Sequence, residues 1–403
     1  MTHRSLKFWL IGMTISAVVA DSMLLPFYPH FFATVFGVTD ANHIGLYLSA
    51  CCFAVILALP LWARLVQHTG VLRLLVCTQV VAGLLSILCY WTDTLAVFWL
   101  VSLGMLVFKA SYLLIYPMIM AEERQDRHGG TIGLLSVVVH LGGIVGAVLG
   151  GAVLQWFEPR QVFLVMSVSD FLQTATCLYL LRRPVNGDAG REVAETPSAA
   201  TPGAGGTVRF LLPLGVVMFG FYFSAYLIRP FFVRHWESAS ALTNEVVSGL
   251  VFAIPAAIAI AALWLNLRRN ATATAGAGIT SALLLAAAGL LIQASDQPLH
   301  VLLGRCLFGW GLFQTTVRLD QLLFALSTPI RYAADFSKIN FCQQFGVLVA
   351  SLVAGSLVAR FELTTPFVAG AAGLLLTAIA FLVLVRPLLR SHAQSPEPVR
   401  SHS

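Results

Sequence analysis

Charged side chains are scarce in this sequence. Only 10% of its 403 residues are Asp, Glu, Lys or Arg, whereas 58% are hydrophobic, and the mean hydropathy is +0.84. A soluble fold of this length needs more charge to cover its surface. The composition therefore excludes a soluble protein and indicates an integral membrane protein. The net charge of +6 then reflects Lys and Arg at a membrane surface, so we expect the lipid bilayer, and not nucleic acid, as a partner.

The sequence also lacks the motifs of common catalytic and metal sites. It contains no HExxH pattern and no Walker-type glycine loop. Its seven cysteines fall in apolar runs without metal-ligand spacing, so we predict neither a metal centre nor a disulfide framework. We expect no enzyme activity, no cofactor and no ATP-driven step.

Long apolar runs make up most of the chain. Twelve of them are long enough to cross a bilayer as helices, for which about 20 residues suffice. They lie near residues 8–35, 44–66, 71–92, 96–121, 131–156, 160–181, 209–235, 246–267, 273–294, 299–327, 337–359 and 365–386. A polar stretch rich in Pro, Gly and Ala separates the sixth run from the seventh, which is typical of a flexible linker.

This pattern predicts an all-α membrane protein with twelve transmembrane helices in two six-helix halves. The expected domains are an N-terminal half (1–181), a cytoplasmic linker (182–208), a C-terminal half (209–386) and a disordered cytoplasmic tail (387–403). We expect a monomer.

The distribution of Lys and Arg predicts the orientation of the chain. These residues number 17 in the termini and in every second loop, but only three in the intervening loops, Arg160, Arg234 and Arg360. Loops rich in Lys and Arg stay in the cytoplasm. Both termini are therefore predicted to be cytoplasmic, and we expect the membrane to be a bacterial inner (plasma) membrane.

The two halves match each other at a constant offset of 204 residues. The matching pairs are Pro26-Phe27 with Pro230-Phe231, Gly45-Leu46 with Gly249-Leu250, Gly142 with Gly346, Gly151 with Gly355, Phe157-Glu158 with Phe361-Glu362, and Phe163 with Phe367. Since each copy holds six helices, an even number, both copies enter the membrane from the same side. The pattern indicates a parallel repeat about an axis along the membrane normal.

Twelve helices in two halves with a cytoplasmic central loop resemble the major facilitator superfamily over the whole chain. The loop between the second and third helices is similar to a motif of that family. Ala63, Gly70 and Arg73 match the motif, whereas Gln67 and His68 stand where the family has an Asp-Arg pair. A tight glycine turn with positively charged flanks is the alternative explanation of this stretch.

The fifth helix resembles the glycine signature of the drug:proton antiporter branch. Gly146, Gly150 and Gly151 match it, and Ala147 stands where the branch has Pro. Gly142, Gly146 and Gly150 recur every fourth residue and share one helix face, on which a partner helix can pack closely. A generic packing helix is the alternative.

The resemblance implies a secondary transporter in which a central cavity opens alternately to the two sides of the membrane. We expect a proton-coupled antiporter that exports a small organic anion, such as a siderophore-like carboxylate or a drug-like compound. Proton-coupled uptake of an organic anion or a sugar is the alternative.

Ionisable residues inside the membrane are the candidate functional residues, because an isolated charge there costs several kcal/mol. Asp21 and Asp170 are the expected proton-coupling residues, although Asp21 as a protonated structural acid remains open. Arg318 and Asp320 are expected to be solvated at the cytoplasmic end of the tenth helix.

Buried cations predict an anionic substrate. Lys109 is the first candidate for contact with it, and Arg229 and Arg305 are the others. A structural pair of Lys109 with Asp170 remains the alternative, as does snorkelling of either arginine to the membrane surface. The polar side chains expected to line the cavity with them include Tyr28, Tyr112 and Tyr222.

Overall fold

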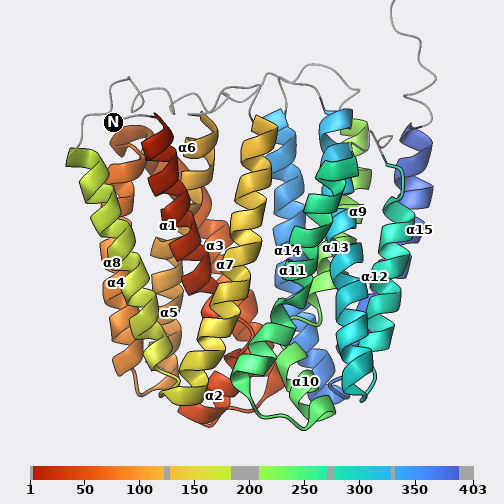
Figure 1. The fold of residues 1–403 in the computed structure, drawn as a ribbon, viewed down its shortest axis with the longest axis horizontal. Helices are drawn as coiled ribbons and strands as arrows, with labels where there is room; N and C mark the ends of the chain where they lie inside the picture. Colours follow the sequence, from red (N-terminus) through yellow and green to blue (C-terminus); the bar gives the residue numbers. More distant parts are fainter. Residues whose placement is uncertain (1–2, 122–127, 183–207, 270–275, 328–331, 390–403) are drawn as a thin grey trace, which may run out of the picture.

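The computed structural model describes residues 3–121, 128–182, 208–269, 276–327 and 332–389, and these ranges contain helices and turns but no strand (Figure 1). The first part of the chain contains α1 (His3–Met23), α2 (Tyr28–Phe36), α3 (Ala41–Thr69), α4 (Val71–Trp91), α5 (Leu95–Lys109), the 3₁₀ turn η1 (Ala110–Leu114), α6 (Ile115–Ala121), α7 (His128–Trp156) and α8 (Gln161–Arg182). The second part contains α9 (Val208–Tyr226), α10 (Phe232–Ser240), α11 (Glu245–Arg269), α12 (Ile279–Gln293), α13 (Pro298–Leu326), α14 (Tyr332–Arg360), α15 (Thr365–Ala380) and the π-helical η5 (Phe381–Val385).

Nine helical stretches in the described part of the chain are long and apolar enough to cross a membrane, judged by length and composition. Three more helices complete the twelve predicted spans. They are the shorter apolar helices Phe210–Tyr226 and Ile279–Gln293 and the 29-residue α13. The all-α fold with twelve spans is confirmed.

The predicted linker and tail fall mostly outside the described residues, which omit 183–207 and 390–403. The last helical span continues to Leu389. The expected start of the tail at residue 387 is therefore too early, because the apolar helix adds a further turn beyond Arg386.

The first and seventh spans are each interrupted at the same point of the repeat. Residues 24–27 separate α1 from α2, and residues 227–231 separate α9 from α10. Each break contains a proline, which lacks the N–H that a continuous helix needs. Phe27 and Phe231, which precede α2 and α10, have nearly the same backbone angles (φ −112°, ψ 8° and φ −116°, ψ 4°). The sequence repeat is thus also a repeat of local backbone structure. The sequence had suggested that each of these apolar runs forms one continuous helix.

Aromatic side chains fill the end of each half that lies farthest from the termini, where α2 and α10 lie (Figure 1). Phe31 and Phe32 of α2 contact Phe98 of α5, with ring centroids 5.3 and 5.8 Å apart. Phe232 of α10 contacts Phe367 of α15 at 6.4 Å. Such pairs contribute about 0.5–1.5 kcal/mol each beyond the burial of their area, so α2 and α10 are held firmly at this end.

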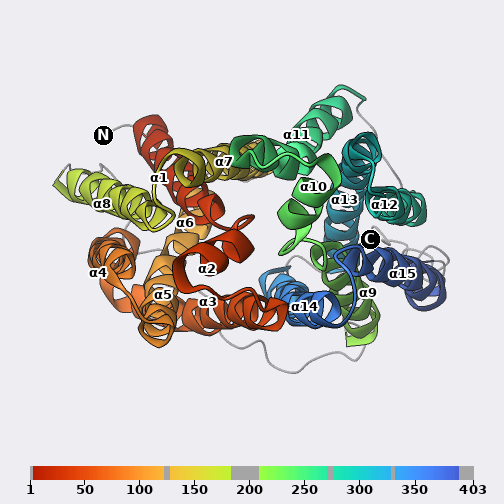
Figure 2. The ribbon, with the colours of Figure 1, turned by 90° about the horizontal axis from the view of Figure 1, so that it is seen from below.

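The two halves stand side by side and meet along two pairs of helices, α7 with α11 and α3 with α14 (Figure 2). A Cβ atom on Gly45 would lie 2.9 Å from Gly355 Cα, and one on Gly249 would lie 2.5 Å from the Ala147 carbonyl oxygen. The offset of 204 residues relates Gly45 to Gly249, so these contacts are equivalent in the repeat. Both lie near the end opposite the termini, where the halves are therefore in close backbone contact.

Candidate functional site

Lys109 lies between two carboxylates inside the first half. It is the last residue of α5, its exposed fraction is 2%, and the 3₁₀ turn η1 follows it. Its Nζ atom is 3.3 Å from Oδ1 of Asp21 on α1 and 3.4 Å from Oδ1 of Asp170 on α8. At these distances the ammonium group forms an ion pair with each carboxylate. Asp21, Lys109 and Asp170 are called the lysine–carboxylate cluster below.

The two acids of the lysine–carboxylate cluster differ in environment. Asp170 is fully buried and accepts a hydrogen bond of 3.1 Å from the Ser86 hydroxyl on α4. The Asp21 side chain keeps 29% of its surface exposed. With all three groups ionised the cluster carries one excess negative charge, and the uptake of a single proton makes it neutral. Neutrality is favoured at a buried site, because uncompensated charge there is costly.

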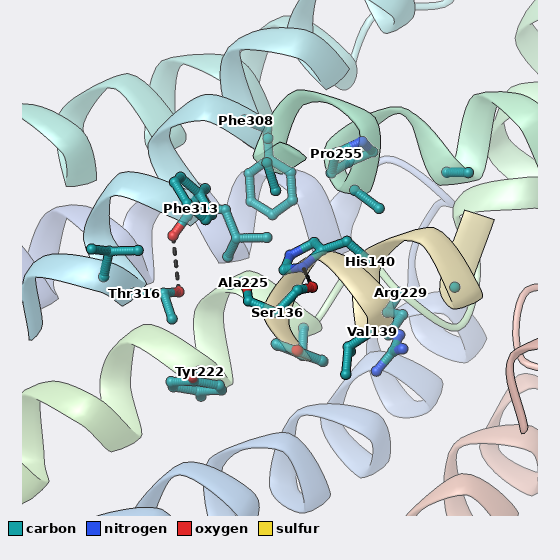
Figure 3. Close-up of a pocket in the computed structure, with 18 of the residues that line it drawn as sticks. Ser136, Val139, His140, Tyr222, Ala225, Arg229, Pro255, Phe308, Phe313 and Thr316 are labelled. Carbon is teal, nitrogen blue, oxygen red and sulfur yellow. Dashed lines mark hydrogen bonds between the residues drawn. The ribbon is translucent and has the colours of Figure 1, made fainter. Parts of the chain in front are cut away.

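A cavity of about 820 Å³ lies between the two halves (Figure 3). Its walls come from α1 and α7 of the first half and from α9, α11 and α13 of the second. Apolar and aromatic side chains form most of the wall, among them Phe308 and Phe313 of α13, with His140 of α7 near the centre of the view. The His140 Nδ1 atom is 2.7 Å from the Ser136 carbonyl oxygen.

Two guanidinium groups line this cavity without an ion-pair partner among the described residues. Arg305 of α13 is only 4% exposed, and it donates a hydrogen bond of 2.8 Å from Nη2 to the Phe252 carbonyl oxygen. Its Cζ atom lies 3.7 Å from the ring centroid of Phe232, while its Nε atom has no hydrogen-bond partner. Arg229 lies over the ring of Tyr226 at 5.0 Å. Rings attract cations, but they do not cancel the charge.

One face of α13 connects this cationic region to an acidic group. Arg305, Gly309, Leu312, Thr316 and Asp320 recur at intervals of three or four residues, and all line the cavity. The fifteen helical steps from Arg305 to Asp320 span about 22 Å at 1.5 Å per residue. The cavity therefore has guanidinium groups toward one end, a carboxyl group toward the other and apolar side chains between them.

The family assignment follows from a model of the Major Facilitator Superfamily that matches residues 10–319. The chain belongs to the Major Facilitator Superfamily. The resemblance seen in the sequence is thereby confirmed, and the superfamily is one of transporters and not of enzymes.

This transporter is also similar to individual members of known function or structure. It is 23% identical over 351 residues to a multi-drug resistance efflux pump PmrA homolog of Lactococcus lactis subsp. lactis, with 84% of each chain covered. Its fold is similar to that of the POT family transporter PepTSo (TM-score 0.78, 10% identity, 98% and 99% of the chains covered). It is also similar to the human organic anion transporter MFSD10 (TM-score 0.70, 15% identity, 94% and 100% covered). The structural likenesses concern the fold alone.

The transporter brings together some of the residues predicted from its sequence and separates others. Arg229, Arg305 and Tyr222 line the cavity. Lys109 does not line it and pairs with both expected proton-coupling acids, so its placement gives no support to a contact with substrate. Tyr28 and Tyr112 also lie outside the cavity wall, close to the Asp21 carboxylate.

The glycines of the antiporter-like motif lie against neighbouring helices. A Cβ on Gly142 would be 2.9 Å from Val18 Cγ1, and one on Gly146 would be 2.5 Å from the Val19 carbonyl oxygen. A Cβ on Gly150 would collide with the Met23 carbonyl group, and one on Gly151 with the backbone of Glu245. Three of these glycines thus hold α7 on α1, and Gly151 holds it on α11 of the other half.

Sequence reasoning misplaced or missed several residues of the cavity. Asp320 was expected to be solvated at the membrane surface, but it is partly buried and lines the cavity because it shares the inward face of α13 with Arg305. Phe252 and Thr316 were not singled out, since apolar residues and hydroxyls are common on all faces of membrane helices. Within the described residues no group of His, Cys, Asp and Glu is arranged to hold a metal ion.

Proposed function

We propose that this transporter is a proton-coupled antiporter that exports small organic anions. The observation that carries the proposal is Arg305, a buried guanidinium on the cavity wall that forms no ion pair within the described residues. A charge in such a position costs several kcal/mol unless a carboxylate or a ligand neutralises it. A carboxylate of the substrate supplies this charge, and Arg229 adds to the attraction.

The shape and lining of the cavity are suited to an anion with an apolar body. Small-molecule sites typically enclose about 300–1,000 Å³ and are mostly apolar with a few polar groups. The cavity of about 820 Å³ is within this range. A siderophore-like carboxylate or an acidic drug-like compound meets both requirements, because each combines an anionic group with apolar surface.

The lysine–carboxylate cluster is the proposed site of proton coupling. It alternates between a charge of −1 and neutrality as a single proton binds or leaves. Asp21 is next in the chain to Ser22, which lines the cavity, so the cluster lies close to the proposed substrate pathway.

Export is the proposed direction. A relative at 23% identity is a multi-drug resistance efflux pump homolog, and the glycine-rich α7 resembles the signature of drug:proton antiporters. Uptake of an organic anion or sugar by symport is the alternative, and the direction of the coupled proton flux distinguishes the two.

Substrate binding is tested with a panel of aromatic, aliphatic and siderophore-like carboxylates in inside-out membrane vesicles. We expect an outward-directed proton gradient, acidic inside the vesicle, to drive accumulation of at least one acid. Arg305→Gln should weaken its binding at least tenfold, which corresponds to about 1.4 kcal/mol. Arg360→Gln, at an exposed position at the end of α14, is the matched control. Equal binding by the Arg305→Gln variant and the wild type would refute the anion site.

Coupling is tested separately with purified protein in liposomes. Asp170→Asn should abolish accumulation driven by a pH gradient, because the cluster then stays neutral without a proton, while exchange down a substrate gradient persists. Gradient-driven accumulation at the wild-type level in both Asp170→Asn and Asp21→Asn would refute the assignment of the cluster.

A further inference from the structure

A second hollow lies on the outer surface of the first half, between α3 and α5. Its volume is about 430 Å³. Its walls are Leu61, Trp62, Arg64, Leu65, His68, Val107 and Phe108. The hollow is separate from the cavity between the halves, and it is called the α3–α5 groove below.

Contacts between α3 and α5 stabilise the walls of the α3–α5 groove. The Trp62 indole N–H donates a hydrogen bond of 2.6 Å to the carbonyl oxygen of Val107, and its ring lies 5.6 Å from that of Phe108. These contacts lie just before α5 gives way to the 3₁₀ turn η1, where the regular helical hydrogen bonds change partners. The groove is therefore a preformed feature of the fold.

Basic side chains lie at one end of the groove. Arg64 and His68 are four residues apart on α3, so they share a face of the helix, and both are exposed. Neither forms an ion pair within the described residues. Since α3 ends at Thr69, Arg64 lies about one and a half turns from the end of the helix. A basic residue this close to the end of a membrane span is expected to reach the lipid headgroups.

Exposed apolar side chains follow α3 from the groove toward the middle of the predicted span. Phe53, Leu57, Leu61 and Leu65 recur every fourth residue on α3, and their exposed fractions are 42–59%. The twelve helical steps from Phe53 to Leu65 span about 18 Å at 1.5 Å per residue. This length is close to that of one leaflet, about half of a 30 Å hydrocarbon core.

We propose that the α3–α5 groove binds one anionic phospholipid. Its phosphate contacts Arg64 and His68, its glycerol region lies against Trp62, and an acyl chain follows Leu61 toward Phe53. Basic pockets between membrane helices bind anionic headgroups, and Trp favours the interface. The exposed basic side chains next to a row of exposed apolar side chains match a phospholipid, which has an anionic headgroup and apolar acyl chains. A peptide or a second copy of this chain would not require this combination, so the arrangement favours a phospholipid.

Native mass spectrometry of the full-length protein tests the proposal. The protein is released from micelles that contain equal amounts of phosphatidylglycerol and phosphatidylcholine with the same acyl chains, and the ratio of the two bound lipids is measured. We expect the wild type to retain phosphatidylglycerol preferentially. Arg64→Gln should lower the ratio about fivefold, the effect of one basic residue near an anionic lipid, whereas Arg64→Lys keeps most of the preference.

Arg73→Gln is the matched control, since it removes a basic residue that lies on the first turn of α4 and outside the groove. An equal fall of the ratio in Arg73→Gln and Arg64→Gln would overturn the proposal, because general surface charge would then explain the preference. A wild type without preference would overturn it as well. Displacement of the bound lipid by excess inorganic phosphate would show that the acyl chain contributes nothing, and would also overturn it.

Discussion

Replacing Lys109 by Gln removes the ammonium group that lies between Asp21 and Asp170. At N–O distances of 3.3 and 3.4 Å, each pair contributes about 5 kcal/mol of Coulomb attraction at an effective dielectric constant of about 20. Much of this offsets the cost of removing the charges from water. Measured losses on breaking a buried pair are about 3–5 kcal/mol, and we expect Lys109→Gln to lower the free energy of unfolding by this amount. The buried Asp170 accounts for most of it, because Asp21 keeps contact with solvent.

The reactivity of buried cysteines provides the assay. Cys89 and Cys177 are buried, so a thiol-reactive fluorophore labels them as the protein unfolds on heating in detergent. The Lys109→Gln variant should label at a lower temperature than the wild type. Asp170→Asn should label close to the wild-type temperature, because Lys109 then still pairs with Asp21 and the cluster is neutral.

The double variant Lys109→Gln with Asp170→Asn separates charge compensation from packing. It should recover most of the stability lost in Lys109→Gln, since the fully buried carboxylate is gone. If Lys109→Gln labels at the wild-type temperature, or if the double variant is no more stable than the single one, the ammonium does not compensate the carboxylates and the reasoning is wrong. Recovery of full gradient-driven transport in the double variant would show that the cluster has only a structural role.

Two further predictions concern conformation and topology. Gly355→Leu should disfavour the conformation in which the halves meet at the end opposite the termini, because a Cβ there would lie 2.5 Å from the Ala41 carbonyl oxygen. Spin-label distances between α3 and α14 should therefore lengthen in this variant. Gly12→Leu is the control and should leave these distances unchanged, since no atom lies within 4 Å of a Cβ at that position. Reporter fusions after Arg183 and after Arg390 should both report the cytoplasm, and opposite signals from the two would contradict the six-plus-six arrangement.

The sequence alone was sufficient to predict the twelve spans, the internal repeat and the membrane-embedded charges. A helix in a bilayer satisfies its own backbone hydrogen bonds and must expose apolar side chains to lipid. Both requirements depend only on neighbouring residues, so the local sequence is enough to identify a span. The glycines shared by the two copies were also visible, because close helix contacts need small residues at regular spacing. The interruptions near Pro26 and Pro230 were less visible, since the residues around them are as apolar as the helices.

The partners of the charged residues were decided by the tertiary structure. Lys109, Asp21 and Asp170 come from α5, α1 and α8, and only the packing of these helices brings both acids to one ammonium group. Arg305 and Asp320 share a face of α13, but that this face lines a cavity depends on the position of the opposite half. Local sequence determines which residues enter the membrane, because that depends on the transfer of each helix from water to lipid. The meeting of two charges depends on distances between helices that are far apart in the chain, and no local pattern contains them.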